Sequence, residues 1–274
     1  MKRAITIALM LAAIQAAAVD VFLPAPTGWT WRVEGVNVLA SYATNGAPAA
    51  PWYESESWYP YSLAYWQFND AAETNITDYS AVGTNLAYLF KSDANATNYS
   101  FASSAFRPDV GTSGTTPYAI IKSSATSLLD GATNWTVAAW VYADSFPALS
   151  AILYRFGATS DGLRCATNAV SGFNNNVVIT KGGAMPTNTW AHVAFTCSGS
   201  AVGARRLYIN GVQVASNTAT SATTMGTNGA WALGMDMRST TDRQWIGMLD
   251  DALLVAYPMS GPDLTNMVNH GRTE

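Results

Sequence analysis

Residues 189–216 read TWAHVAFTCSGSAVGARRLYINGVQVAS, and this stretch decides the fold. Over 190–197, apolar and polar residues alternate with a period of two, which predicts a half-buried β-strand. A second apolar run, 206–209, leads directly into Asn210-Gly211 and then into 212–214. Asn-Gly between apolar runs is a strong signal for a type I′ hairpin turn, since both central residues of that turn need positive φ. The stretch therefore predicts two strands and the start of a third.

Similar short runs recur along the rest of the chain. Residues 260–269 alone are predicted to be helical, with Ser260 as N-cap and Asp263 as the acid of a capping box. About a dozen strands with one short helix predict an all-β fold, a two-sheet antiparallel sandwich with a short C-terminal helix. The other predicted strands are 30–34, 63–70, 85–90, 118–121, 134–142, 151–155, those around Leu163 and Val178, 230–234 and 244–255, with 91–117 as a polar surface insertion.

The composition is poor in charge. Charged residues are 12% of the 274 residues, about half the roughly 25% of average soluble domains. The net charge is −4 and the chain has no basic run, so nucleic-acid binding is not expected. The polar residues are mainly Ser, Thr, Asn and Gly, which suits an exported β-protein with an uncharged polar surface.

Residues 1–18 have the pattern of a cleavable export signal. Met1-Lys2-Arg3 is positive, 4–14 is apolar, and Ala16-Ala17-Ala18 provides a small-residue cleavage site. The apolar run is too short to span a bilayer unless it is tilted or extended, so a retained membrane anchor is the less favoured alternative, and no later run is long enough. We expect a mature chain that begins near Val19, has no membrane span, and is secreted, periplasmic or on the cell surface.

Residues 19–61, the leader, combine prolines with aromatic residues. The leader is short for a core of its own, so we expect it to pack on the main domain, 62–274. Its tryptophans are either platforms for sugars or a cover over a sheet, and the leader is also a candidate docking segment for a protein partner. The candidate platforms are Trp29, Trp31, Trp52 and Trp58.

Several blocks of sequence stand in order along the main domain. They are A-Y-W-Q-F-N-D (64–70), D-Y-S-A-V-G (78–83), N-W-T-V-A-A-W-V (134–141), the opening stretch, and G-M-L-D-D-A-L-L-V-A-Y-P-M-S (247–260). In this order they resemble the laminin-G-like, concanavalin A-like lectin/glucanase jelly-roll family. The resemblance covers 63–271 and implies that fold. It implies little about function, because the fold hosts lectin-like modules, adhesion domains and some hydrolases. Asn69, Leu253 and Val255 depart from the family's usual Asp, Arg and Tyr.

The resemblance also implies a structural calcium ion. Family members often hold one between the opening and closing strands, which points to Asp250, with Asn69, Asp70 and Asp78 as partners. Calcium takes six to eight oxygen ligands, and carboxylates, amides and carbonyls all serve. The alternative is that Asp250 and Asp78 accept backbone N–H bonds and fix turns.

No catalytic residue is predicted. The related laminarinase-type hydrolases use an E-x-D-x-x-E strand, and the chain has no such run. The nearest approach is Glu54-Ser55-Glu56, in a Pro-flanked segment. His192 and His270 stand alone, without zinc-type spacing or a Ser-His-Asp order. A glycoside hydrolase-related enzyme is therefore the least favoured hypothesis.

Six other tryptophans stand at positions that the resemblance assigns to the core, which are Trp66, Trp135, Trp140, Trp190, Trp231 and Trp245. A polar loop predicted at 171–176 offers further ligand candidates in Phe173, Asn174 and Asn175.

The chain has two cysteines, Cys165 and Cys197. If the strands form a meander, the run 176–180 lies between theirs, and two strand spacings, about 10 Å, are too far for a disulfide. We therefore expect two buried free thiols.

The leading hypothesis is an exported, non-catalytic jelly-roll module that binds carbohydrate or another surface ligand and is stabilised by calcium. The rival is a structural or adhesion subunit of a cell surface or virion, docked through the leader.

Overall fold

The structure is a computed structural model. It describes residues 29–34, 37–42, 51–68, 75–76, 78–81, 87–91, 100–101, 105–107, 119–123, 128–146, 149–156, 159–218, 220, 224–227, 229–236 and 243–270. The predicted export signal lies outside these ranges. The chain divides into two compact units, Met1–Ser55 and Glu56–Glu274.

The first unit contains a small antiparallel hairpin. β1 (Trp29–Glu34) pairs with β2 (Asn37–Tyr42), from Trp29 opposite Tyr42 to Glu34 opposite Asn37. This confirms the strand predicted at 30–34 and adds a partner strand that the sequence did not predict. A 3₁₀ turn, η1 (Trp52–Ser55), follows in the same unit. The packing of the leader on the main domain stays a prediction.

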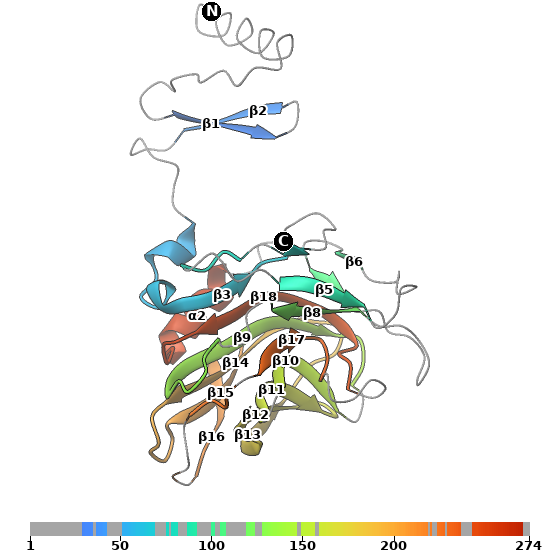
Figure 1. The fold of residues 1–274 in the computed structure, drawn as a ribbon, viewed down its shortest axis with the longest axis vertical. Helices are drawn as coiled ribbons and strands as arrows, with labels where there is room; N and C mark the ends of the chain where they lie inside the picture. The colour runs from blue at the N-terminus through green and yellow to red at the C-terminus, as the bar shows by residue number, and fades with distance from the viewer. Residues whose placement is uncertain are drawn as a thin grey trace, which may run out of the picture. The chain divides into compact units, whose positions relative to one another are not determined.

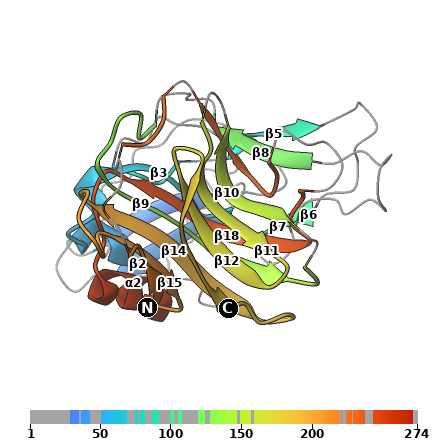
Figure 2. The same cartoon turned by 90° about the horizontal axis from the view of Figure 1, so that it is seen from below.

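The second unit is a sandwich of two eight-stranded antiparallel sheets (Figures 1 and 2). This confirms the predicted fold class. The β10 sheet runs in the order β13 (Val177–Ala184), β12 (Ala169–Asn174), β11 (Asp161–Ala166), β10 (Ser150–Phe156), β17 (Ala230–Leu233), β8 (Ala119–Ser123), β5 (Ala87–Lys91), β4 (Asn75–Ile76). The β14 sheet runs β16 (Val212–Ser216), β15 (Arg205–Ile209), β14 (Trp190–Ser198), β9 (Asn134–Ala143), β18 (Gly247–Val255), β7 (Phe106–Arg107), β6 (Ser100–Phe101), with β3 (Ser62–Trp66) also on β18.

The opening stretch forms β14, β15 and β16 as predicted. Asn210 and Gly211 have φ of 50° and 76°, the positive values that a type I′ turn needs. The turn is also tied back to β14. Asn210 donates its backbone N–H to the carbonyl of His192 at 2.8 Å, and its Oδ1 accepts the N–H of His192 at 2.8 Å. The hairpin is therefore fixed by local chemistry and by one side chain.

The core lies between the two sheets. The inward side chains of β14 are Ala191, Val193, Phe195 and Cys197, and all four are fully buried in it. Trp66, Trp135, Trp231 and Trp245 are at most 1% exposed and belong to the same core, as predicted. The other two tryptophans of that prediction lie outside the core cluster: Trp140 is buried, and Trp190 is half-buried with its ring centroid 5.6 Å from that of Tyr142.

The outer face of β14 is buried as well, so the prediction of a half-buried strand is wrong. His192, Ala194 and Thr196 are at most 1% exposed. The chain after β18 covers this face. Thr136 Oγ1, on β9 opposite Thr196, donates to the carbonyl of Tyr257 at 2.7 Å and accepts the N–H of Met259 at 2.9 Å.

The helix α2 (Gly261–His270) follows this cover and is the predicted C-terminal helix. The backbone N–H and Oγ of Ser260 both donate to Asp263 Oδ2 at 2.7 Å, and the N–H of Asp263 donates to Ser260 Oγ at 3.4 Å. This confirms the capping box. Leu264 and Met267 are the buried side chains of the helix. The helix thus forms a further layer on the outer face of the β14 sheet.

Three local predictions differ from the structure. The loop at 171–176 is largely strand, because β12 pairs on both sides and only Asn175 and Asn176 turn, with φ of 53° and 67°. The predicted surface insertion contains β7, whose Phe106 is fully buried in the core. The strand predicted at 63–70 ends at Trp66, shortly before Phe68 takes a positive φ of 51°.

Cys165 and Cys197 are buried free thiols, as predicted, but for a different reason. β13 does not lie between their strands. β11 and β14 belong to different sheets, and packed sheets are about 10 Å apart. The cysteines therefore belong to opposite layers of the core.

We expect neither thiol to react with an aromatic disulfide reagent in the native protein at pH 8. Burial raises the pKa of Cys165 to about 12 and also raises that of Cys197, and the thiolate is the reactive form. Both thiols should titrate once the chain is unfolded in guanidinium without reductant. An unfolded chain with no reactive thiol would mean that a disulfide forms.

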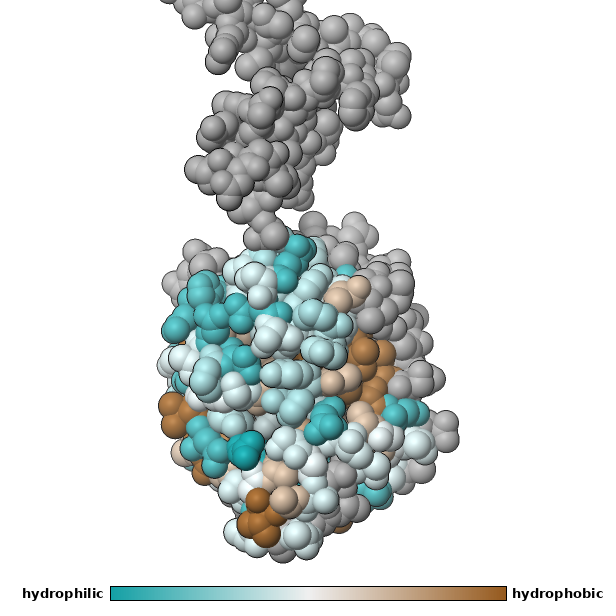
Figure 3. Space-filling view, turned by 90° about the vertical axis from the view of Figure 1, so that its left-hand side faces the viewer, coloured by the Kyte–Doolittle hydropathy of each residue, from teal (hydrophilic) through white to brown (hydrophobic). Residues whose placement is uncertain are grey.

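In the described part of the chain, no helix combines the length and apolar character needed to cross a membrane. The face shown in Figure 3 is mostly polar or neutral, with small separate apolar patches, in keeping with the low-charge composition.

Candidate functional site

The tryptophans of the leader do not form one row of exposed rings among the described side chains. Trp29 and Trp31 lie in β1, and their side chains are outside the described part. Trp52 is half-buried in η1, with its ring edge-on to Tyr53 at 5.9 Å between centroids. Trp58 is 0% exposed and stands edge-on to Tyr65 of β3 at 6.2 Å. Trp58 therefore presents no platform to a ligand and has the covering role that was the alternative.

Asn174 belongs to a buried polar network. Its Nδ2 donates to Asp161 Oδ1 and to the carbonyl of Thr224, both at 3.2 Å, and its Oδ1 accepts from Arg205 Nε and Nη2 at 3.4 and 3.3 Å. The amide is 1% exposed. Both ends of the amide are occupied, so Asn174 joins β11, β12 and β15 and is not free to bind a ligand. Asn175 is exposed in the turn that follows.

Asp161, at 0% exposure, is the centre of that network. Its Oδ1 accepts the N–H of Asn175 at 2.6 Å, and its Oδ2 accepts Thr159 Oγ1 at 3.1 Å and the N–H of Gly226 at 3.3 Å. Arg155, also 0% exposed, lies with Nη1 3.5 Å from Asp161 Oδ2 and pairs with Asp130 as well. A buried carboxylate with this many donors organises loops and is committed to structure.

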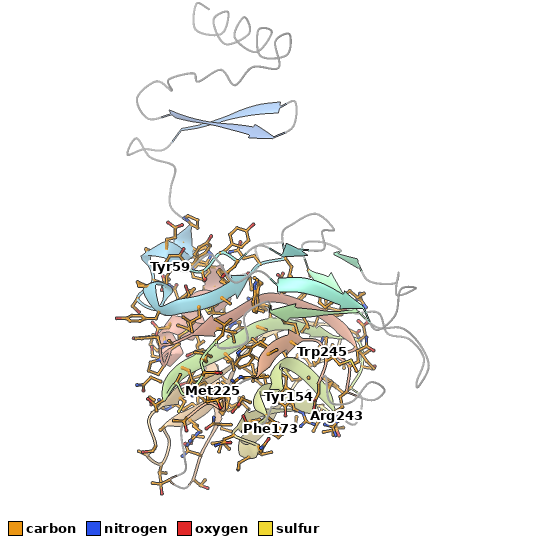
Figure 4. All side chains as sticks on the ribbon, viewed as in Figure 1. Tyr59, Tyr154, Phe173, Met225, Arg243 and Trp245 are labelled. Carbon is orange, nitrogen blue, oxygen red and sulfur yellow. The ribbon has the colours of Figure 1, made fainter. Side chains whose placement is uncertain are left out.

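Phe173, by contrast, contacts an arginine and a second aromatic ring. The Arg164 cluster consists of Tyr154 on β10, Gly162 and Arg164 on β11, and Phe173 on β12. The guanidinium carbon of Arg164 lies 4.7 Å from the ring centroid of Phe173 and 5.3 Å from that of Tyr154. The two rings stand edge to face, with centroids 6.0 Å apart. Figure 4 labels Tyr154 and Phe173, which lie on the two strands that flank β11.

Gly162 explains why two rings from non-adjacent strands meet. It pairs with Tyr154 on one side and with Phe173 on the other. Strands two steps apart are separated by about 9.6 Å, so the rings lean together across a residue without a side chain. Gly162 has φ of 114°, and an added Cβ would lie 2.3 Å from the Leu153 carbonyl oxygen. Glycine is therefore required at this position.

The guanidinium of Arg164 has no carboxylate partner within the described residues. Its side chain is 93% out of solvent, with an exposed fraction of 7%, and its Nε has no hydrogen-bond partner there. In the described part of the chain, the arginines that form ion pairs are Arg107, Arg155 and Arg243. The recorded side-chain contacts of Arg164 are instead with the two aromatic rings.

The proposed metal ligands are only partly described. Asn69 and Asp70 lie outside the described residues. Asp78 Oδ1 accepts the backbone N–H groups of Tyr65 and Ser80, both at 2.9 Å, and Asp250 Oδ1 accepts that of Asp251 at 2.8 Å. Within the described residues no three His, Cys, Asp or Glu side chains come together as a metal site. The backbone bonds are those of the turn-fixing alternative, and calcium stays a prediction.

His192 packs against Trp140 on the outer face of the β14 sheet, with centroids 5.5 Å apart. Both ring nitrogens lack a partner among the described residues, and complete burial lowers the pKa from 6.5 to about 4. The unfolded chain therefore binds the proton more readily than the folded one. The contribution of His192 to the free energy of unfolding is therefore fully present above pH 6.5 and is lost as the pH drops from 6.5 to about 4.

We expect His192→Gln to reduce the fall in the free energy of unfolding with decreasing pH. One such histidine can make that fall as steep as about 1.4 kcal/mol per pH unit. Urea unfolding of wild type and variant at pH 7.5, 6, 5 and 4.5 measures it. His270→Gln, at an exposed helix end, is the control and should keep the wild-type slope. An unchanged slope in His192→Gln would contradict the assignment.

Sequence reasoning found Phe173 but missed Tyr154 and Arg164. One signal was available. In D-G-L-R-C-A (161–166), Arg164 alternates with Leu163 and Cys165, so a strand there puts an arginine on the face opposite the core. What the sequence does not give is the pairing of β10, β11 and β12, which brings the rings to that arginine.

Comparison with known families identifies the fold class. The family model described as the concanavalin A-like lectin/glucanases superfamily, of the laminin G type, matches residues 113–265, more than half of the chain. The chain belongs to this superfamily. No curated protein sequence shows a significant match.

Solved structures share the fold at low sequence identity. The Trypanosoma rangeli sialidase in complex with sialic acid aligns with a TM-score of 0.54 at 12% identity, over 76% of this chain and 32% of the sialidase chain. The botulinum neurotoxin serotype D binding domain gives 0.54 at 15%, over 79% and 53%. Botulinum neurotoxin type C, whose cell entry depends on interaction with two ganglioside molecules, gives 0.53 at 13%, over 78% and 52%. The chain thus spans about a third to a half of these chains, and the likeness concerns the fold alone.

Proposed function

We propose that the chain is an exported, non-catalytic carbohydrate-binding module whose ligand site is the Arg164 cluster on the β10 sheet. The observation that supports this most is the half-buried Phe173 beside Tyr154 and an arginine with no carboxylate partner among the described residues. Sugar sites combine an aromatic surface for C–H groups with a few polar groups that fix orientation. The sialidase and toxin domains of the same fold are described in complex with sialic acid or interacting with gangliosides.

The absence of catalysis is part of the proposal. The sequence has no E-x-D-x-x-E run, and the nearest approach, Glu54-Ser55-Glu56, is not a pair on one strand face. Glu56 Oε1 accepts the side-chain amide of Asn266 at 2.7 Å, a contact that holds α2. Glu54 is exposed in η1.

A glycan array with the mature protein, with and without calcium, tests the proposal. We expect binding to a restricted set of glycans that is weakened when Phe173 is replaced by alanine. Phe146→Ala, at another half-buried phenylalanine that contacts Trp245, is the control and should leave binding unchanged. No glycan above background would overturn the proposal.

A calcium ion near Asp250 remains part of the proposed function, on the strength of the family resemblance. Asp250 and Asp251 place two largely buried carboxylates at the bulge of β18. We expect added calcium to raise the melting temperature of the chelator-treated protein, and Asp250→Asn to reduce that rise. Equal melting temperatures with calcium and with chelator would remove calcium from the proposal.

The second candidate function is a structural or adhesion subunit that docks through the leader. The observation that favours it is the division of the chain at Ser55, which leaves the β1–β2 hairpin in a compact unit of its own. Light scattering of the mature protein tests it, since this role requires self-association or a bound partner.

A further inference from the structure

We propose that the Arg164 cluster recognises the carboxylate of an acidic sugar residue, with the sugar ring resting on Phe173. This inference rests on the proposed function and specifies its ligand class. It starts from the state of Arg164 itself. Arg164 as a whole residue is 7% exposed, its Nε is buried without a hydrogen-bond partner among the described residues, and no carboxylate of those residues pairs with it. In this proposal the carboxylate of the ligand supplies the negative charge that the described residues do not.

The two rings keep the guanidinium ready for such a group. The guanidinium carbon lies over the ring of Phe173 at 4.7 Å and over that of Tyr154 at 5.3 Å, so cation–π attraction to two rings holds the group in place. Held in this way, the fork of N–H donors matches a carboxylate with two parallel hydrogen bonds. Since the side chain is already ordered, little rotamer entropy is lost on binding.

The residues that pair with Arg164 and Tyr154 across the sheet carry no negative charge. Arg164 pairs with Ala151 on β10 and with Ser171 on β12, and Ser171 pairs with Lys181. In the neighbouring row, Tyr154 pairs with Ala232, which pairs with Lys122. Neither row contains an acidic residue at these positions, although the whole chain has a net charge of −4. An anionic ligand thus meets no like charge from these positions.

The half-buried Phe173 provides the apolar contact. Its ring lies beside the guanidinium, so a pyranose that places its carboxylate on Arg164 can lay C–H groups against this ring. A neutral sugar would keep the ring contact and leave the guanidinium unpaired. We therefore expect Arg164 to distinguish acidic from neutral sugars. Phe173 should contribute to the affinity for both kinds of sugar.

Isothermal titration calorimetry with matched ligands tests the inference. The probes are trigalacturonic acid and 3′-sialyllactose, each beside its methyl ester, in which the carboxylate is neutralised. We expect at least one acid to bind the wild-type protein at least about tenfold more tightly than its ester. Arg164→Gln should remove that difference, and Arg164→Lys, which keeps the charge but not the fork, should restore part of it.

Arg206→Gln is the matched control, because Arg206 lies on β15 of the other sheet and should leave the acid-to-ester ratio unchanged. Melting temperatures show whether each variant folds, and the ester comparison uses wild-type protein alone. Equal binding of acid and ester, or binding of neither acid, would overturn the inference. If neutral glycans bind on the array and Arg164→Gln binds them equally well, carbohydrate binding stands although the acidic-sugar inference fails. If no glycan binds on the array, both the proposed function and this inference fail.

Discussion

Replacing Asp161 with alanine is expected to lower the free energy of unfolding by about 3–5 kcal/mol, the usual cost of breaking a buried ion pair. The change removes the acceptor of Arg155, Asn174, Thr159 and two backbone N–H groups in one step. Arg155 would keep Asp130, but the loop at Gly226 and the β12–β13 turn would lose their anchor. Urea unfolding followed by far-ultraviolet circular dichroism measures the loss, and a melting temperature lower by on the order of 10 °C should accompany it.

The matched control for this experiment is Asp144→Ala. Asp144 also pairs with an arginine, Arg107, but both side chains keep about a third of their surface in solvent, 35% and 34%. Exposed pairs contribute at most about 1 kcal/mol, so this variant should stay close to wild type. Equal losses in the two variants would mean that Asp161 is an ordinary ion-pair partner and not the centre of a network.

Trp58→Ala is expected to cost about 3–5 kcal/mol, as for other buried tryptophans cut to alanine. Its ring is 0% exposed and stands edge-on to Tyr65, on the outer face of the β14 sheet. Deleting it leaves a cavity under the 3₁₀ turn η2 (Tyr59–Tyr61). Thermal unfolding measures the loss.

This experiment also separates the two roles considered for Trp58. A covering role predicts lower stability with glycan binding unchanged at a temperature where the variant is folded. A platform role predicts weaker glycan binding with unchanged stability. The control is Tyr61→Ala, because Tyr61 is 52% exposed and stacks on Tyr257 at 5.5 Å, so its loss should be small. A variant of Trp58 that melts like wild type would contradict its burial.

The sequence predicts what is decided within a few residues. Asn210-Gly211 makes its turn wherever the flanking strands pair, and Ser260 with Asp263 caps a helix through bonds three residues apart. The order of the family-like sequence blocks predicted the two-sheet sandwich. Predictions failed where distant segments meet. The outer face of β14 was expected to be exposed to solvent. The sequence around β14 does not indicate that Tyr257 and Met259 fold back onto Thr136 and cover this face.

The candidate site was only partly predictable for the same reason. Phe173 drew notice as an aromatic residue in a polar stretch, but its partners come from β10 and β11, and their meeting depends on Gly162 between them. Trp58 and Asn174 were ligand candidates by composition. Burial against Tyr65 and bonding to Asp161 gave them structural roles that no spacing rule reveals.

The position of β18 sets the order in which the β14 sheet can form. It is the last strand along the described chain, yet it pairs with β3, the first strand of the second unit, and with β9 and β7. A ribosome-bound chain that still lacks residues 247–255 has no centre for this sheet, and contacts between such distant segments form slowly. Completion of the β14 sheet must therefore wait until synthesis has passed β18.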